Sequence, residues 1–208
     1  AVYKTNNTDQ LFSLPHSTAT GYSFSFINAG EIQNKGIEVA LSGTPIRTTD
    51  FTWDVRVNWS KNRNKMVSLT QGRENLQLAS FQSGVSLNAT VGEPYGILRG
   101  TGFVFDANGN KVIDEESGLY ETANNQVIGN IQADWIGGVY NRVAYKNLAL
   151  SFLIDVKQGG DVYSLDQAYG LYTGLYPETV GNNDLGNPKR NSIENGGGVI
   201  LPGVYANG

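Results

Sequence analysis

The side chains that could do chemistry are few, and their spacing marks no catalytic centre. The chain has one histidine, His16, and a serine–histidine–aspartate centre would need it as the general base. No Gly-x-Ser-x-Gly motif accompanies it, so we interpret His16 as a solvated loop residue. None of the 19 Asp and Glu residues is marked by spacing as an acid–base pair for sugar hydrolysis. The sequence therefore predicts no enzyme, and a surface glycoside hydrolase has the least support.

Residues 106–114 have a spacing that could bind calcium. Asp106, Asn108, Asn110 and Asp114 stand at positions 1, 3, 5 and 9 of an EF-hand-like loop. The glycine and glutamate that such a loop needs later are replaced by Lys111 and Ser117. Asn108-Gly109 is instead a strong signal for a hairpin turn. We favour the turn, keep calcium as an alternative, and predict no metal or cofactor.

Tyrosines gather in the C-terminal quarter of the chain, at Tyr163, Tyr169, Tyr172 and Tyr176. Their rings could stack on sugars, or they could pack a small core of the loop itself. We favour packing, because nothing in their spacing indicates a binding platform.

The elements that would position such residues are strands. In residues 51–60, five apolar side chains alternate without a fault with five polar ones. A strand points successive side chains to opposite faces, whereas a helix would leave this segment with no polar face. Residues 51–60 are therefore predicted to form a strand with one apolar face and one polar face.

Two antiparallel hairpins follow from the same pattern. Residues 36–43 alternate ahead of the strand at 51–60, and residues 135–145 alternate ahead of a return strand at 148–157. Residues 61–134 and 159–208 are predicted to be long, polar, Gly-rich excursions, with further strands at 85–91 and 97–105. The first thirty residues are predicted to be loop-like, with a short alternating piece at Tyr22, Phe24 and Phe26.

Composition limits the class of protein. The 26 Gly residues and 11% aromatic content suit an all-β chain with frequent turns. A formal net charge of −4 argues against a nucleic-acid partner, which would want a basic face. The chain has no cysteine, hence no disulfide framework. No apolar run approaches the ~20 residues of a transmembrane helix, although transmembrane β-strands leave no such run because half their residues are polar.

The alternation leaves two architectures open. A soluble β-sandwich, such as a carbohydrate-binding module on a bacterial surface, would bury the apolar faces between two sheets. A transmembrane barrel would instead turn them to lipid, with short turns at one end, long loops at the other and aromatic residues at both interfaces. Residues 51–59 would then cover roughly 20 Å of membrane at ~3.3 Å per residue and ~40° tilt.

The chain also carries an ordered series of short motifs. The first is Asn28-Ala-Gly-Glu-Ile-Gln-Asn-Lys-Gly-Ile-Glu-Val-Ala-Leu41, followed by Thr44-Pro45-Ile46 and Asp50-Phe-Thr-Trp53. Later members are Gly92-Glu-Pro-Tyr-Gly96, Asp106-Ala-Asn-Gly109, Ile128-Gly129, Asp134-Trp135, Tyr145-Lys146-Asn147-Leu148, Asp155 and Gly159-Gly160. In this order they resemble the C-terminal barrel region of SusC/RagA-like TonB-dependent outer-membrane receptors.

The resemblance implies an antiparallel transmembrane β-barrel of about 22 strands with long extracellular loops, in the bacterial outer membrane. It also implies TonB-coupled import of glycans or peptides, without chemistry on the substrate, under a SusD-like surface lipoprotein. Residues 1–208 would be a partial barrel domain, truncated at both ends, without the plug and closing strands. TonB would be reached through N-terminal parts that are absent.

Strand parity then assigns the two faces of each wall strand. The apolar side chains would face the lipid bilayer. The predicted lumen-facing residues are Thr52, Asp54, Arg56, Asn58, Ser151, Asp155 and Lys157. A register error of one residue would invert these assignments.

Overall fold

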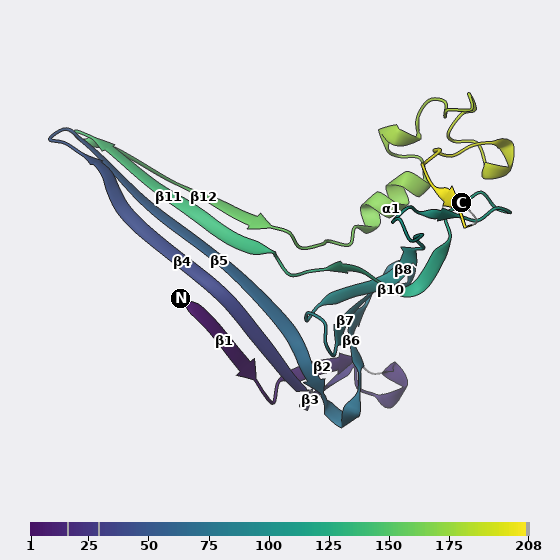
Figure 1. Ribbon diagram of the computed structural model, residues 1–208, viewed down its shortest axis with the longest axis horizontal. Coiled ribbons are helices and arrows are strands. Elements are labelled where there is room, and N and C mark those ends of the chain that lie inside the picture. The colour runs from purple at the N-terminus through teal and green to yellow at the C-terminus, as the bar shows by residue number, and fades with distance from the viewer. Residues whose placement is uncertain (16, 29, 207–208) are drawn as a thin grey trace. The chain divides into compact units, whose positions relative to one another are not determined.

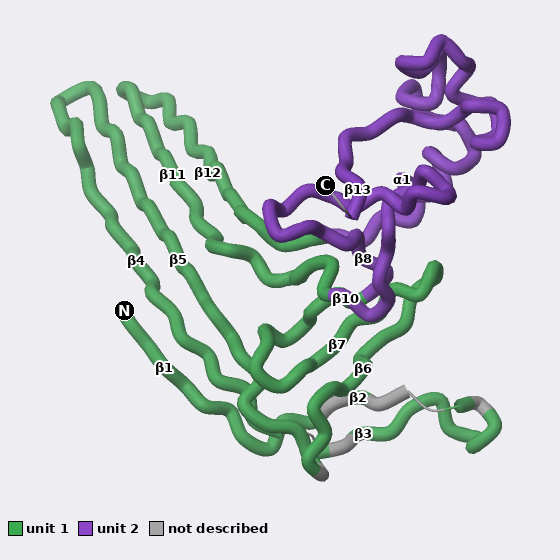
Figure 2. Tube along the Cα trace, turned by 45° about the vertical axis from the view of Figure 1, so that its right-hand side comes forward, with its two compact units in different colours: residues 1–99, 127–161 green, residues 100–126, 162–208 purple. Residues whose placement is uncertain are grey.

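The computed structural model describes residues 1–15, 17–28 and 30–206, so His16 lies outside the described residues. The chain divides into two compact units (Figure 2). Unit 1 comprises residues 1–99 and 127–161, and unit 2 comprises residues 100–126 and 162–208. Within the described segments, no helix is both long and apolar enough to cross a membrane.

Unit 1 is built on a five-stranded antiparallel sheet in the order β1-β4-β5-β11-β12 (Figure 1). Its strands are β1 (Val2–Asn7), β4 (Gly30–Arg47), β5 (Phe51–Leu69), β11 (Trp135–Tyr145) and β12 (Leu148–Gln158). Both predicted hairpins are present, as β4–β5 and β11–β12. Strand β5 joins them by pairing with β11 from Phe51 opposite Tyr145 to Ser60 opposite Ile136.

Short turns close the two hairpins at the same end of the sheet. Between β4 and β5, the Phe51 N–H donates to the Thr48 hydroxyl at 3.0 Å. Between β11 and β12, Lys146 adopts a positive φ of 51°, and its N–H donates to the Asp50 carbonyl of the neighbouring turn at 2.8 Å. All longer connections of this sheet therefore leave from its other end.

A second sheet, in the order β10-β8-β7-β6, follows β5 in the chain. Its strands are β6 (Asn75–Ser80), β7 (Ser86–Thr90), β8 (Ile97–Phe103) and β10 (Thr122–Asn130). Its unit 1 part holds a hydrophobic cluster in which Met66 and Leu69 of β5 pack with Leu76 and Ala89, and Met66 is fully buried. A separate two-stranded ladder pairs β2 (Leu11–Pro15) with β3 (Phe24–Asn28).

Unit 2 contains the remaining small elements. They are β9 (Val112–Ile113), α1 (Leu165–Tyr172) and β13 (Val204–Tyr205), and β13 pairs in parallel with β9. Single 3-10 turns lie at Thr18–Thr20, Thr70–Gly72 and Gln82–Gly84 of unit 1 and at Pro177–Thr179 and Ile193–Asn195 of unit 2. Helix α1 begins after Ser164, whose hydroxyl accepts from the Gln167 N–H at 3.2 Å and caps the helix.

The structure corrects three boundaries of the sequence prediction. The first thirty residues include β1, β2 and β3, so their description as loop-like is wrong. The excursion predicted to begin at residue 61 begins only after Leu69, because β5 stays paired with β4 up to that residue. The excursion at 159–208 contains α1. Strands β7 and β8 match the further strands expected within the first excursion, whereas β6 and β10 were not predicted.

Candidate functional site on the polar face of the five-stranded sheet

The register shows which side chains share a face of the five-stranded sheet. Directly paired residues of antiparallel strands point to the same side. Asp54 is opposite Arg142, which is opposite Ser151, and Asn58 is opposite Gly138, which is opposite Asp155. The same reasoning brings the seven residues of the predicted lumen face onto one side of the sheet: Thr52, Asp54, Arg56, Asn58, Ser151, Asp155 and Lys157. We call this side the polar face.

The other side, here named the apolar face, is a continuous band across all five strands. Many of its side chains are exposed, including Leu41 at 65%, Leu148 at 78% and Leu150 at 65%. The band consists of Val2, Ile37, Val39, Leu41, Ile46, Phe51, Trp53, Val55, Val57, Trp59, Trp135, Val139, Val143, Tyr145, Leu148, Leu150, Phe152, Ile154 and Val156. Aromatic residues stand at both of its ends, as Phe51 and Tyr145 beside the turns and as Trp59 and Trp135 opposite them.

One polar side chain interrupts the apolar face and is satisfied there. Asn141 is buried, and its side-chain carbonyl accepts a hydrogen bond from the Trp53 indole N–H at 3.2 Å. A buried amide without a partner would cost free energy, so the tryptophan makes the asparagine tolerable in an apolar environment.

Asp54 is the centre of the hydrogen-bonded cluster on the polar face. The Thr44 hydroxyl donates to one carboxylate oxygen of Asp54 at 2.7 Å, and the Arg142 guanidinium lies 3.4 Å from the other. Thr44 reaches this position because β4 shifts its register between Gly43 and Ile46, opposite Asp54. The irregularity therefore adds a residue of β4 to the cluster, which strand parity alone would build from β5 and β11.

Arg56 occupies the next row of the polar face. Its guanidinium carbon lies 5.8 Å from the centre of the Tyr140 ring, the residue directly opposite on β11. Such a cation–π contact holds the arginine over the ring without neutralising its charge. Asp54, Arg56, Tyr140 and Arg142 line a depression of about 350 Å³ together with Ser42 and Thr44.

A gap in the following row brings two more predicted residues together. A side chain on Gly138 would approach the Asn58 amide oxygen within 2.9 Å and an Asp155 carboxylate oxygen within 3.2 Å. Glycine at this position therefore lets Asn58 and Asp155 lean toward each other over the sheet. Together these rows place hydrogen-bond donors and acceptors side by side along the polar face.

Three residues of the cluster were missed by reasoning from sequence. Tyr140 and Arg142 belong to the polar face of β11, and the alternation of 135–145 that predicted the apolar face could also have found them. Thr44 could not be found in this way, because the register shift in β4 leaves no mark in the alternation.

The segment at 106–114 forms a turn, as favoured from the sequence. Phe105 bridges Lys111, and Gly109 has a φ of 84°. One Asp106 carboxylate oxygen accepts the Asn108 and Asn110 backbone N–H groups at 2.8 Å, and the other accepts the Asn110 side chain at 3.1 Å. Both oxygens of Asp106 thus serve the turn, and the described residues contain no cluster of three metal-ligating His, Cys, Asp or Glu side chains.

The tyrosines of unit 2 do not behave as one group. Tyr176 packs its ring against Gly170 of α1, and its hydroxyl donates to the Asp166 carbonyl at 3.3 Å. Tyr172, at the end of the same helix, is 88% exposed. The preference for packing is confirmed for Tyr176 and wrong for Tyr172.

Comparison with known proteins gives relatives of one kind. The TonB-dependent receptor P26 of Formosa agariphila is 32% identical over 183 residues, which cover 78% of this chain and 18% of that protein. The TonB-dependent receptor P3 of the same organism is 28% identical over 182 residues, or 77% of this chain. SusC of Bacteroides thetaiotaomicron is 26% identical over 65% of the chain. No protein-family model matches.

Solved structures give the fold. The RagAB peptide importer in its closed-closed state aligns with a TM-score of 0.58 at 19% identity, over 76% of this chain and 19% of that one. The structure described as the RagAB peptide transporter aligns with a TM-score of 0.56. The all-β, antiparallel barrel-segment fold expected from the sequence is confirmed.

The class of protein is that of TonB-dependent receptors. Within it, the chain is similar to one segment of the SusC/RagA-like receptors, as its ordered motifs indicated. The chain spans about a fifth of the length of the curated relatives that it matches.

Proposed function

We propose that this chain supplies wall strands and extracellular loops to an outer-membrane importer of oligosaccharides or peptides. The observation that carries the proposal is the pair of opposite faces on the five-stranded sheet. One is a continuous exposed apolar band with aromatic ends, and the other is polar. An outer-membrane location follows from the class of the relatives.

The position of the second sheet argues against the soluble alternative. In a β-sandwich the second sheet covers the apolar face of the first. Here the hydrophobic cluster packs on Met66 and Ile32, which are paired residues on the side that carries Asn58 and Arg56. The unit 1 part of the second sheet thus packs on the polar side of β4 and β5 at their loop end and not on the apolar face.

The polar face suits passage of a polar solute. Asp54, Arg56, Asn58 and Asp155 present charged and amide groups that can exchange hydrogen bonds with sugar hydroxyls or peptide groups. In the proposed importer these residues face the lumen, with Thr52, Ser151 and Lys157. No step breaks a bond of the substrate, so the chain is not an enzyme.

The relatives extend the proposal to partners. TonB would supply energy through segments outside this chain, as the name TonB-dependent receptor indicates for the relatives. A SusD-like surface lipoprotein would cover the extracellular loops. RagAB is described as a peptide transporter, and the family resemblance implies glycans, so peptides and oligosaccharides are the two substrate classes to test.

Neighbouring positions on β5 test the placement of the two faces. The chain has no cysteine. If any cysteine elsewhere in the complete receptor is first replaced, the single substitutions Val57→Cys and Asn58→Cys each provide one position for a label. We expect a bimane label at position 57 to be quenched by brominated lipids and a label at position 58 not to be. Ile154→Cys and Asp155→Cys on β12 form a second matched pair.

The same strains test import. Cells that produce the receptor should take up fluorescent oligosaccharides or peptides, and an uncoupler should abolish this uptake. Equal quenching at positions 57 and 58 would contradict the assignment of faces. Uptake of both substrate classes that is unchanged when the receptor is deleted would contradict the importer.

A further inference from the structure

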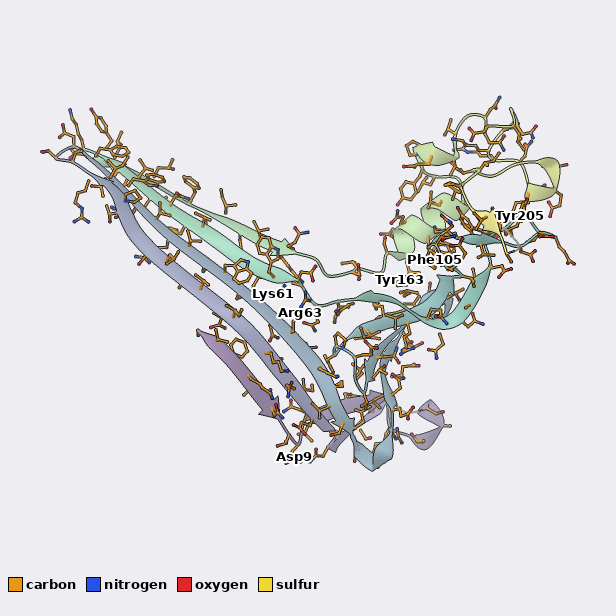
Figure 3. All side chains as sticks on the ribbon, in the orientation of Figure 1. Asp9, Lys61, Arg63, Phe105, Tyr163 and Tyr205 are labelled. Carbon is orange, nitrogen blue, oxygen red and sulfur yellow. The ribbon has the colours of Figure 1, made fainter. Side chains whose placement is uncertain are left out.

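The apolar face becomes cationic just beyond Trp59. Strand β5 continues without a break, and Lys61, Arg63 and Lys65 occupy every second position on the same side as Trp59. Lys61 and Arg63 are labelled in Figure 3. Lys35 on β4 is directly opposite Arg63, and Lys4 on β1 is directly opposite Lys35. We call Lys4, Lys35 and Arg63 the cationic row, and the row together with Lys61 and Lys65 the cationic collar.

The collar is a concentration of like charge that, among the described residues, is paired with a carboxylate only at Arg63. All five side chains are exposed. Arg63 pairs with Asp134 at 2.9 Å, and it is the only collar residue with an ion pair among the described residues. The other carboxylate on this side of β4, Glu31, accepts a hydrogen bond from Asn6 at 2.6 Å. Like charges directly opposite one another destabilise a sheet, so the cationic row favours an external anion.

The collar begins at the depth of lipid headgroups and extends outward from it. With ~3.3 Å per residue and ~40° tilt, Lys61 lies roughly 5 Å beyond Trp59 along the membrane normal, and Arg63 roughly 10 Å. Headgroup regions are about 5–8 Å thick on each side of the hydrocarbon core. Lysine and arginine side chains are long enough to adjust their charged ends to this layer.

The opposite end of the apolar face has no such collar. Arg47 there is paired with Thr52 and so lies on the polar face, and Lys146 shares the turns with Asp50. At the turn end one cation, Lys146, lies 5.4 Å from the centre of the Tyr145 ring, whereas the loop end carries the five residues of the collar.

We infer that the cationic collar docks the phosphate groups of anionic lipid headgroups in the leaflet on the loop side of the membrane. The inference rests on the proposed function, which places the apolar face in lipid. The occupant is a lipid because the collar continues the apolar face without a step. A headgroup held there keeps its acyl chains against the apolar band.

The test compares the thermal stability of the complete receptor in two kinds of nanodisc. One kind contains phosphatidylcholine alone, and the other contains phosphatidylcholine with phosphatidylglycerol. We expect the native receptor to gain several degrees of Tm in the anionic discs, and this gain to shrink as sodium chloride is added. The variant Lys4→Gln/Lys35→Gln/Arg63→Gln should lose more than half of the gain.

A matched variant controls for charge. Arg56→Gln/Arg142→Gln/Lys157→Gln removes three cations from the polar face and should keep the full gain. A full gain in the collar variant would overturn the inference. So would an equal gain when inorganic phosphate is added to phosphatidylcholine discs, because the collar would then bind free phosphate and not lipid.

The label at position 57 separates the two proposals. If lipid quenches that label and the collar variant behaves as the native receptor does, only the lipid-docking inference fails. If lipid does not quench it, the proposed function fails as well.

Discussion

Single side chains show how a polar residue is accommodated on the apolar face. Asn141 would be costly in an apolar environment, and the Trp53 indole N–H satisfies it from the neighbouring strand. The pair lies one row away from the hydrogen-bonded cluster around Asp54, on the opposite side of the sheet. Polar groups therefore appear on both faces, but only those of the polar face are open to a solute.

The Trp53–Asn141 hydrogen bond predicts a coupled pair of mutations. Trp53→Phe leaves the Asn141 amide without its donor and should lower the free energy of unfolding by about 1–3 kcal/mol. Adding Asn141→Leu removes the orphaned group and should recover most of this loss. Urea unfolding of the complete receptor in lipid vesicles measures both. Losses that simply add in the double variant would show that the two side chains are not coupled.

At the scale of elements, the turn at 106–114 is held by one carboxylate. Hydrogen bonds from Asn110, first through its backbone and then through its side chain, hold the pKa of Asp106 below its usual value of 3.8. The folded turn thus favours the ionised form. Its contribution to stability is present above the unfolded value and is lost as the pH falls through the lower folded value.

Acid should therefore loosen this turn. We expect amide-exchange protection at Asn108 and Asn110 to fall below about pH 4, as carboxylates such as Asp106 gain a proton. Asp106→Ala should remove the protection at every pH, whereas Asp114→Ala, which affects the separate turn at Ser117, should leave it unchanged. Hydrogen-exchange mass spectrometry of the detergent-solubilised receptor measures these rates. Protection at Asn108 and Asn110 that survives Asp106→Ala at neutral pH would contradict the role of Asp106.

Elements also show what the sequence could predict. The hairpins β4–β5 and β11–β12 were predictable because most of their residues alternate between apolar and polar and their turns are short. Strand β1 was missed because its sequence, Val-Tyr-Lys-Thr-Asn-Asn, has no such alternation and is held by backbone pairing with β4. The pairing of β5 with β11 joins residues that are far apart in sequence, and no local pattern indicates it.

For the candidate site, parity was sufficient to gather seven residues on one face. It could not reveal Thr44, which depends on an irregular register, nor the approach of Asn58 and Asp155 to the space above Gly138.

At the scale of the whole molecule, the five-stranded sheet has two open edges, β1 and β12, and an uncovered apolar face. Unpaired edges and large exposed apolar surfaces promote association. We expect the isolated 208-residue chain to sediment as aggregates in buffer and to remain dispersed in detergent. Analytical ultracentrifugation measures this difference. A compact monomer that unfolds cooperatively without detergent would instead support the soluble β-sandwich.

The register shift in β4 has a consequence for how this wall can change in length. Along β5 from Val55 to Met66 the pairing with β4 is regular, so the gain or loss of one residue there would exchange the two faces beyond it, and only changes by two would preserve them. In β4 the residues on the apolar side are odd-numbered up to Gly43. The extra residue at Thr44 and Pro45 changes this, so that the even-numbered Ile46 lies on the apolar side. At that site the insertion or deletion of a single residue can change the size of the irregularity without exchanging the two faces of the sheet. We expect the length variants that are tolerated within β4 to cluster there.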